Sequence, residues 1–351
     1  MTNTWWQDSI PALDETARNA ALTRQTVLTK PAGSLGRLET LAVKLAAMQG
    51  RAEPDLAHPW ISVFAADHGI AAAGVSAYPR EVTLQMVANF AAGGAAICVL
   101  ARHIGARFEV IDVGVAGDTS AWPDVVQAKT VNGTASFLEE PAMSEATVDS
   151  ALAAGREAVA RAVAAGADCF IAGEMGIGNT TSATALACLW LERDPEAMTG
   201  AGTGLDDAGI RRKAGVVRNA LALHRTMSAD PKSALARLGG AEIAAMAGAY
   251  VAAAQARLPV IVDGYISSVA ALAATRLNPG AAAWFLFGHE SAEKAHRDVL
   301  AALGGQPVLA LGLRLGEGSG AAAAFPVIQA ACRLHSRMAT FAEAGVSDRE
   351  A

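Results

Sequence analysis

Six short apolar runs, separated by long helical patterns, constrain the fold of this chain more than any other feature. The runs are Trp60–Ala66, Phe108–Val113, Asp168–Gly173, Pro259–Val262, Trp284–Phe287 and Val308–Leu311. The alanine-rich helical segments between them include Ser144–Ala165, Asp207–His224, Ala241–Ala256 and Ser291–Leu303. Short apolar strands that alternate with helices are typical of a parallel sheet covered on both faces. The sequence therefore predicts an α/β fold with a doubly wound, mostly parallel sheet.

The two ends of the chain differ from its middle. Residues before about 58 and after about 320 have helical patterns and contain none of the apolar runs. We expect residues 58–319 to form the α/β domain that carries the functional site. We expect residues 1–57 and 320–351 to meet beside it as a discontinuous, small helical subdomain.

Composition and charge narrow the class of protein. The formal net charge is −6, so a nucleic-acid surface, which needs clustered Lys and Arg, is not expected. No apolar stretch reaches the roughly 18 residues that a membrane span needs; for example, Glu242 and Gln255 flank Ile243–Ala254. The sequence therefore predicts no membrane span. Met1–Ile10 lacks the basic start of a secretory signal. Scattered cysteines in apolar segments favour free thiols in a reducing cytoplasm: Cys98, Cys169, Cys188 and Cys332.

Polar side chains follow the apolar runs where the predicted strands end. They are Asp67, His68, Asp112, Glu174, Asp263, His289 and Glu290, with Glu317 a few residues after the last run. Open parallel sheets bind ligands outside the carboxyl ends of their strands, so these side chains predict a site at one rim. The alternative is that each caps a helix or a turn, which we expect of some of them.

A glycine-rich segment, Gly173–Thr181, comes directly after a predicted strand and opens a helix. Backbone N–H groups at a helix N-terminus are typical of an anion-binding loop. The segment lacks the Gly-Lys-Ser/Thr ending of a Walker A loop. It also departs from the dinucleotide fingerprint, because Thr181 occupies the place of the third glycine.

A second glycine loop, Gly200–Gly204, precedes a helical pattern that carries Arg211, Arg212 and Lys213. A lysine beside backbone donors suits a phosphomonoester. Lys213 is therefore a candidate phosphate ligand, whereas Arg211 and Arg212 fit a solvated basic turn of helix.

Glu317 lies between Gly316 and Gly318 in the segment Arg314–Ala321. Surface glutamates ordinarily sit among helix formers, so this setting favours a functional role. A partly desolvated carboxylate with a raised pKa is suited to general-base catalysis.

The sequence gives little support for a metal site or for a covalent nucleophile. Ligand-type residues occur at Asp67, His68, His289, Glu293 and His296, but without HExxH, Cys/His or EF-hand spacing. The chain has no Gly-x-Ser-x-Gly elbow either. We expect no metal and no covalent nucleophile.

Taken together, these segments resemble the nicotinate-nucleotide–dimethylbenzimidazole phosphoribosyltransferase family over nearly the whole chain. The matching segments are Lys30–Glu39, Ala66–Gly69, Gly74–Ser76, Gly93–Ala96, Gly173–Thr181, Val262–Gly264, Gly288–Lys294 and Arg314–Ala321. Each is weak alone, but the ordered set is specific. The resemblance implies a doubly wound fold and a homodimeric enzyme that needs no metal or organic cofactor.

The resemblance also implies a reaction and its residues. Ribose 5-phosphate would pass from nicotinate mononucleotide to 5,6-dimethylbenzimidazole or a related base, giving α-ribazole 5′-phosphate and nicotinate with inversion. Glu317 would be the general base, with Glu174 beside it. The implied phosphate and nucleotide contacts are Gly176, Ile177, Gly178, Asn179, Gly202, Lys213, Asp263 and Ser291. The implied base pocket contains Tyr78, Gln85, Met86 and Leu315.

The chemistry agrees with this interpretation. Nicotinate leaves from a cationic pyridinium without acid help, so the enzyme positions two rings and removes one benzimidazole proton. Some family members carry serine at position 78 and glutamine at position 86, where this chain has Tyr78 and Met86. The preferred base therefore stays open. Two alternatives also stay open: an NAD-dependent oxidoreductase, favoured by the glycine loops, and a non-catalytic nucleotide-binding protein.

Overall fold

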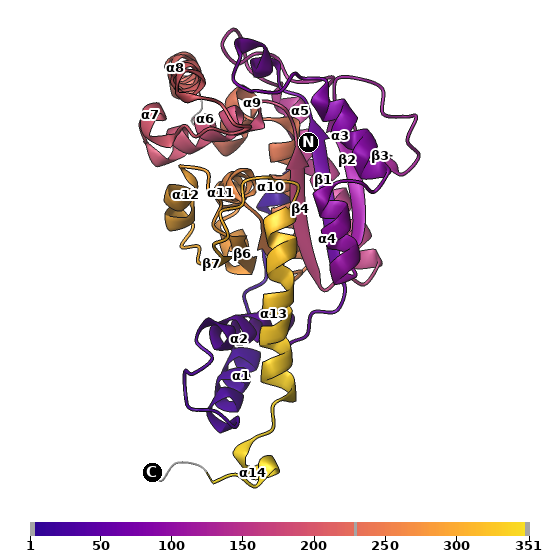
Figure 1. Cartoon of the computed structure of the whole chain (residues 1–351), viewed down its shortest axis with the longest axis vertical. Helices are drawn as coiled ribbons and strands as arrows, with labels where there is room; N and C mark the ends of the chain where they lie inside the picture. Colours follow the sequence, from indigo (N-terminus) through magenta and orange to yellow (C-terminus); the bar gives the residue numbers. More distant parts are fainter. Residues whose placement is uncertain (1–3, 228–229, 348–351) are drawn as a thin grey trace.

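A seven-stranded sheet, in which every pairing is parallel, forms the centre of the computed structural model (Figure 1). The structure describes residues 4–227 and 230–347. The strands are β1 (Pro59–Ala66), β2 (Arg107–Gly114), β3 (Val125–Gln127), β4 (Cys169–Met175), β5 (Val260–Val262), β6 (Phe285–His289) and β7 (Pro307–Leu309). The predicted α/β fold is confirmed.

The direction in which the sheet grows reverses at β1. Its strand order is β3-β2-β1-β4-β5-β6-β7, so the chain first runs outward from β1 to β3 and then continues on the other side from β4 to β7. Val63 of β1 accordingly pairs with Val110 of β2 and with Gly173 of β4. In doubly wound sheets, ligands bind at such a reversal, outside the carboxyl ends of the strands.

The predicted strands agree with the structure except at one edge. Each of the six apolar runs forms a strand, with ends shifted by a few residues. The strand β3 was not predicted, because it has only three residues and its apolar part is the pair Val125 and Val126. It forms by pairing with Val110–Asp112 of β2, a long-range contact that a local pattern does not show.

Helices cover both faces of the sheet (Figure 1). α4 (Ala96–Ile104) and α13 (Ser319–Arg337) lie in front of the strands in this view. α5 (Glu145–Ala164) and α10 (Ala241–Gln255) pack against each other on the opposite face. This packing requires small residues, because a Cβ at Gly155 would lie 1.9 Å from the carbonyl oxygen of Ala245.

Most of the predicted helices are confirmed. The other helices are α3 (Val82–Ala91), α6 (Asn179–Leu191), α7 (Pro195–Met198), α8 (Asp207–His224), α9 (Pro231–Leu238), α11 (Tyr265–Leu277), α12 (His296–Ala302) and α14 (Phe341–Ala344). Short 3₁₀ helices cover Trp5–Gln7, Gly69–Ala73, Arg225–Met227 and Pro279–Trp284. The predicted helix over Ser291–Leu303 is wrong in its first part, because residues 291–295 form a turn in which Ser291 bonds to His296.

The terminal helices meet at one end of the molecule (Figure 1). α1 (Glu15–Val27) and α2 (Arg37–Gln49) pack together, and α2 also packs on α13. Arg24 of α1 donates hydrogen bonds to the carbonyl oxygens of His335 and Ser336. Since α13 also packs on β6, it runs continuously from the sheet to these helices. We propose that the two chain ends form the small helical subdomain, with α13 connecting it to the α/β domain.

One stretch of the described residues, Val82–Ile104, is long and apolar enough in composition to cross a membrane. In the fold it consists of α3 and α4, separated by residues 92–95. Each helix is about 15 Å long, whereas a bilayer has a hydrocarbon core of roughly 30 Å. Neither helix is therefore long enough to span a bilayer.

Candidate active site

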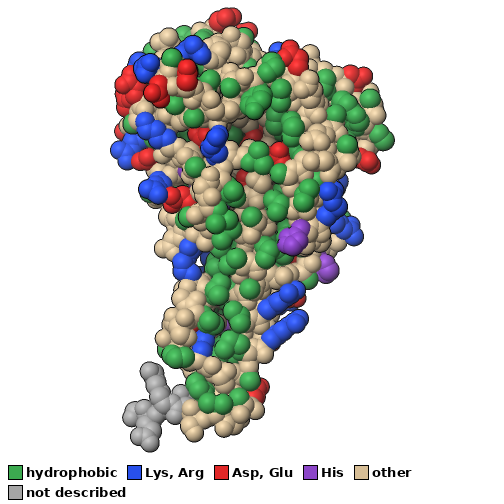
Figure 2. Space-filling model, viewed as in Figure 1, with side chains coloured by type: hydrophobic (Ala, Val, Ile, Leu, Met, Phe, Trp, Pro, Cys, Tyr) green, Lys and Arg blue, Asp and Glu red, His purple; other side chains and the backbone are tan. Residues whose placement is uncertain are grey.

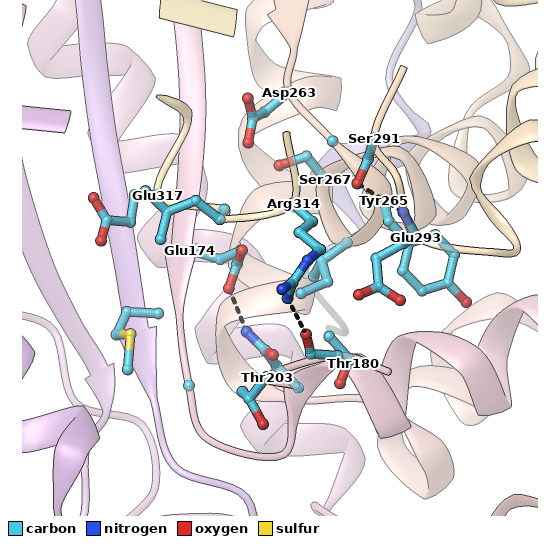
Figure 3. A pocket seen from close by; sticks show the side chains of 18 of the residues that line it. Glu174, Thr180, Thr203, Asp263, Tyr265, Ser267, Ser291, Glu293, Arg314 and Glu317 are labelled. Atoms are coloured by element: carbon cyan, nitrogen blue, oxygen red, sulfur yellow. Dashed lines mark hydrogen bonds between the residues drawn. The ribbon is translucent and has the colours of Figure 1, made fainter. Parts of the chain in front are cut away.

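A cavity of about 520 Å³ opens at the carboxyl ends of β4, β5 and β6 (Figure 3). This volume lies in the range of small-molecule sites. Tyr78, Val82 and Met86 reach it from the region after β1. Its other lining residues are Glu174–Ile177, Asn179, Thr180, Gly202, Thr203, Asp263–Ser267, His289, Ser291, Glu293 and Arg314–Glu317.

Glu174 stands near the end of β4, where only 6% of the residue is exposed. Asn179, at the start of α6, donates a hydrogen bond to its carboxylate. Burial, followed by the charges of Glu242, Asp263 and Glu317, raises the pKa of Glu174 well above its ordinary value. This carboxyl group therefore retains a proton more readily than an exposed glutamate does.

Glu317 occupies a left-handed backbone conformation, with φ of 64°, between Gly316 and Gly318. The turn passes so close to β4 that a Cβ at Gly173 would lie 2.1 Å from the carbonyl oxygen of Glu317. Burial raises the pKa of the Glu317 carboxylate, while a hydrogen bond from the backbone N–H of Ile97 opposes the increase. In Figure 3 this carboxylate points away from Glu174. The pair does not share a proton directly in this arrangement.

Asp263 connects the end of β5 to the start of α13. Its Oδ1 accepts a hydrogen bond of 2.7 Å from the backbone N–H of Ala321 and lies 3.7 Å from Nε2 of His289. Burial raises the pKa of Asp263, and the neighbouring His289 opposes that rise. The carboxylate thus holds the segment after Glu317 against the floor of the cavity.

The loop after β4 supplies backbone donors at a helix N-terminus. α6 begins at Asn179, and its N-cap, Gly178, offers no side chain to satisfy the first N–H groups. Thr83 fixes the loop by accepting a hydrogen bond of 3.1 Å from the N–H of Ile177. Such a helix start is suited to bind an anion.

Lys213 lies directly behind the second glycine loop. Its Nζ donates a hydrogen bond of 2.7 Å to Oγ1 of Thr180, and a Cβ at Gly202 would lie 3.0 Å from the same nitrogen. Burial lowers the pKa of Lys213 to about 8, although Glu293 opposes this shift. Its positive charge therefore reaches the cavity past a glycine and a threonine hydroxyl.

The structure brings most of the predicted site residues together. Those that line the cavity are Glu174, Gly176, Ile177, Asn179, Gly202, Asp263, Ser291, Glu317, Tyr78, Met86 and Leu315. Three do not line it. Gly178 packs against His68, Lys213 lies behind Gly202, and Gln85 is exposed on α3 beside Met86. Adjacent helical positions point in different directions, so Met86 faces the cavity where Gln85 does not.

Several lining residues were not predicted. Arg314 donates a hydrogen bond of 3.1 Å to the carbonyl oxygen of Gly202, so its guanidinium joins two walls. Oγ1 of Thr203 accepts from the N–H of Ala77 at 3.0 Å and contacts the hydroxyl of Ser76 at 3.1 Å. Both residues lie inside glycine-rich segments that the sequence singles out, and this was the available signal. Glu293 lies in the matching segment Gly288–Lys294, but the sequence marks it only as a candidate metal ligand, and Tyr265 carried no comparable signal.

Some strand-end residues serve turns instead of the site. Asp67 accepts a hydrogen bond from the N–H of Ala116 at 2.8 Å, and Asp112 accepts from the N–H of Val115 at 2.8 Å. His68 forms a buried pair with Glu242, with 2.7 Å between Nε2 and Oε1. None of these four side chains lines the cavity within the described part of the chain. The alternative interpretation as caps and turns applies to Asp67 and Asp112.

Within residues 4–227 and 230–347, no group of three or more His, Cys, Asp or Glu side chains is arranged to hold a metal ion. The four cysteines are free and buried.

Comparisons with known proteins cover the whole chain. A family model described as "Phosphoribosyltransferase" matches residues 10–346. The nicotinate-nucleotide–dimethylbenzimidazole phosphoribosyltransferase of Pseudomonas aeruginosa is 56% identical over 100% of both chains. The enzyme of that name from Azotobacter vinelandii is 57% identical over 99% of each chain. The crystal structure of CobT from Thermus thermophilus superposes with a TM-score of 0.92 at 46% identity, covering 95% of this chain and 99% of that one.

Proposed function

The chain belongs to the nicotinate-nucleotide–dimethylbenzimidazole phosphoribosyltransferase family, and on that premise we propose how its cavity performs the transfer. The enzyme moves ribose 5-phosphate from nicotinate mononucleotide to 5,6-dimethylbenzimidazole or a related base. The names of the relatives favour this reaction over an NAD-dependent oxidoreductase or a non-catalytic nucleotide-binding protein. One observation carries the assignment of the site: the buried carboxylate of Glu317 and the anion-binding loop before α6 line the same cavity.

The phosphate end of the nucleotide binds at the glycine loops. Gly176, Ile177 and Asn179 present the start of α6, and Gly202 lets the ammonium group of Lys213 come close. Backbone N–H groups and a cation together suit a phosphomonoester. Asp263 and Ser291, which line the wall formed after β5 and β6, contact the ribose 5-phosphate from another side.

The base binds between apolar side chains near Glu317. Tyr78 and Leu315 are 56% and 59% exposed, although both line the cavity, and Met86 lies beside them. An aromatic ring placed here would cover apolar surface that otherwise contacts water. Gln85 does not face the cavity, so we assign its expected role to Met86.

The reaction is a displacement at the anomeric carbon. One benzimidazole nitrogen forms a bond to C1′ while the bond from C1′ to the pyridinium nitrogen breaks. The bonding pair stays on that nitrogen, so nicotinate leaves with an uncharged ring. The proton on the other benzimidazole nitrogen passes to Glu317. Attack from the face opposite the leaving group inverts the anomeric centre. Because the leaving group is already cationic, the step needs no acid or organic cofactor.

We propose further that the enzyme is a cytoplasmic homodimer. Hydrophobic side chains gather along α13 and the neighbouring helices on the face shown in Figure 2. The helix α4 packs against α13, and its Val99 is 54% exposed. Large apolar patches on a soluble protein commonly mark an interface. A second copy of the chain is the partner that the family resemblance implies.

The test of the function is direct. Purified enzyme would be incubated with nicotinate mononucleotide and each of several benzimidazoles, in the presence of EDTA, and the products separated by chromatography. Release of free nicotinate with equimolar formation of a new nucleotide is expected. Absence of both products with every base, in EDTA and also after a divalent ion is added, would overturn the proposal. Activity that requires an added divalent ion would overturn the metal-free mechanism.

A further inference from the structure

His296 is a fully buried histidine that the transfer reaction does not use. It begins α12 and lies behind the cavity wall formed after β6. Its Nδ1 accepts a hydrogen bond of 2.7 Å from the backbone N–H of Ser291. On the other side of the ring, Nε2 lies 2.9 Å from Oγ of Ser268 in α11. The ring therefore bridges two segments that both contribute to the cavity.

These contacts fix the protonation state of the imidazole. A backbone N–H can only donate, so Nδ1 of His296 must carry a lone pair. The neutral ring then holds its proton on Nε2 and donates it to Ser268. Burial, aided by the charge of His289, lowers the pKa of His296 to about 3. The histidine consequently acts as a fixed acceptor at the pH of the cell and is not suited to shuttle protons.

The turn that His296 holds carries two cavity residues. Ser291 and Glu293 both line the cavity, and Oγ of Ser291 accepts a hydrogen bond of 3.3 Å from the N–H of Glu293 (Figure 3). The turn is tied down on its other side, where the N–H of Ala292 donates to the carbonyl oxygen of Leu313 at 2.9 Å. Without His296, the N–H of Ser291 would lose its acceptor inside the protein.

The second segment held by His296 is the start of α11. Tyr265 and Ser267, in the first turn of that helix, line the cavity, and Ser268 follows directly. The rings of Tyr265 and His296 are 6.4 Å apart between centroids in an edge-to-face arrangement. His296 thus sets the spacing between the wall after β5 and the wall after β6.

We propose that His296 is a positioning residue for the nucleotide. It holds Ser291 and Glu293 in the place on the cavity wall from which they contact the ribose 5-phosphate. This inference rests on the proposed function, because it takes the nucleotide to be the ligand of that wall. It predicts an effect on nucleotide binding that is separate from binding of the base, since Tyr78 and Met86 belong to a segment that, within the described part of the chain, does not contact this turn.

Two substitutions at this position separate a positioning role from simple packing. In His296→Asn, the side-chain oxygen can replace Nδ1 as the acceptor for Ser291. In His296→Leu, a residue of comparable bulk leaves that N–H without an acceptor. We expect His296→Leu to raise the KM for nicotinate mononucleotide about tenfold, equivalent to about 1.4 kcal/mol. The KM for the base should change less than about twofold, and His296→Asn should restore most of the nucleotide affinity.

Further variants keep the test decisive if His296→Leu folds poorly. Ser268→Ala keeps the imidazole but removes its second partner, and a two- to fivefold rise in the same KM is expected, on the order of one weakened hydrogen bond. His224→Leu is the control, because it removes another buried histidine. His224 contacts the carbonyl oxygen of Phe137 at 2.9 Å, and its loss should leave the nucleotide KM unchanged. Nitrogen-15 NMR of the wild type should show an unprotonated Nδ1 in His296.

The outcomes distinguish this inference from the proposed function. Equal rises in both KM values, or no rescue by asparagine, would reduce His296 to a packing residue and overturn the inference. A protonated Nδ1 would do the same. If the wild type forms no nucleotide product, the proposed function fails, while the NMR result still reports on the hydrogen bond.

Discussion

The carboxylate of Glu317 accepts a hydrogen bond of 3.2 Å from the backbone N–H of Ile97, in the first turn of α4. The residue at the N-cap of that helix, Ala95, has no side chain that could serve there. Glu317 therefore supplies a cap from another part of the chain in addition to its proposed chemistry. The partial positive charge of the helix start favours the ionised carboxylate. This effect opposes the rise in pKa that burial causes.

This dual role determines which substitution reports on catalysis. Glu317→Gln retains an oxygen that accepts from Ile97 but cannot take the benzimidazole proton. We expect its kcat to fall roughly 100- to 10,000-fold, the usual range for general-base catalysis, with little change in Tm. Glu317→Ala loses the cap as well, so its Tm should also fall. If Glu317→Gln turned over within a few-fold of wild type at saturating substrate, the base would have to be Glu174.

The pH dependence of kcat follows from the same group. Glu317 acts as a base only when ionised, and burial places its pKa above the ordinary value. The rate should therefore fall tenfold per pH unit below that raised pKa and stay level above it. A pH profile of kcat for wild type and Glu317→Gln would check this. A wild-type profile that is flat throughout the acid range would speak against a carboxylate base.

Glu174 should make stability depend on pH. Its folded pKa lies well above that of an unfolded glutamate, so the folded protein binds the extra proton. This contribution to stability is complete below the unfolded pKa and is lost as pH rises through the folded pKa. We expect Glu174→Gln, which stays neutral, to gain stability relative to wild type as pH rises from 5 to about 8. Urea unfolding at several pH values measures this difference, and a constant difference would contradict it.

Lys213 should anchor the phosphate only while charged. Burial lowers its pKa to about 8, so the nucleotide KM of the wild type should rise as pH increases from about 7 to 9. At pH values below about 8, Lys213→Ala should have a higher KM than wild type and a nearly unchanged kcat, and the difference in KM should shrink as the wild-type lysine loses its charge. The matched control is Arg211→Ala, which removes an exposed cation from the same helix. A reduced kcat with an unchanged KM in Lys213→Ala would show that the lysine is not a phosphate anchor.

The proposed dimer can be tested at its apolar face. Multi-angle light scattering of wild type should give about twice the mass of one chain, 35.8 kDa. Val99→Asp places a charge among the exposed apolar side chains of α4, beside α13, and should produce monomers. Leu223→Asp on α8, where the leucine is 42% exposed, should remain dimeric. A monomeric wild type at working concentration would reject the proposal.

Local patterns in the sequence were sufficient for the elements and for the chemistry of the main motifs. Apolar runs separated by helical spacing predict the parallel sheet, because a strand buried on both faces needs a continuous apolar segment. The glycines on both sides of Glu317 set it apart from ordinary surface glutamates, and both adopt the positive φ that few other residues adopt easily. Both properties belong to neighbouring residues and can be recognised without the fold.

The tertiary structure alone decided which groups meet. Ile97 and Glu317 are 220 positions apart, yet the carboxylate of Glu317 caps the helix that contains Ile97. The chain also places Lys213 behind Gly202, brings Arg314 and Thr203 into the cavity, and diverts Asp67 to a turn. Hydrogen-bond partners, burial and the resulting pKa values depend on how distant backbone segments pack. Sequence spacing does not encode them, because residues that lie far apart in the chain supply the contacts.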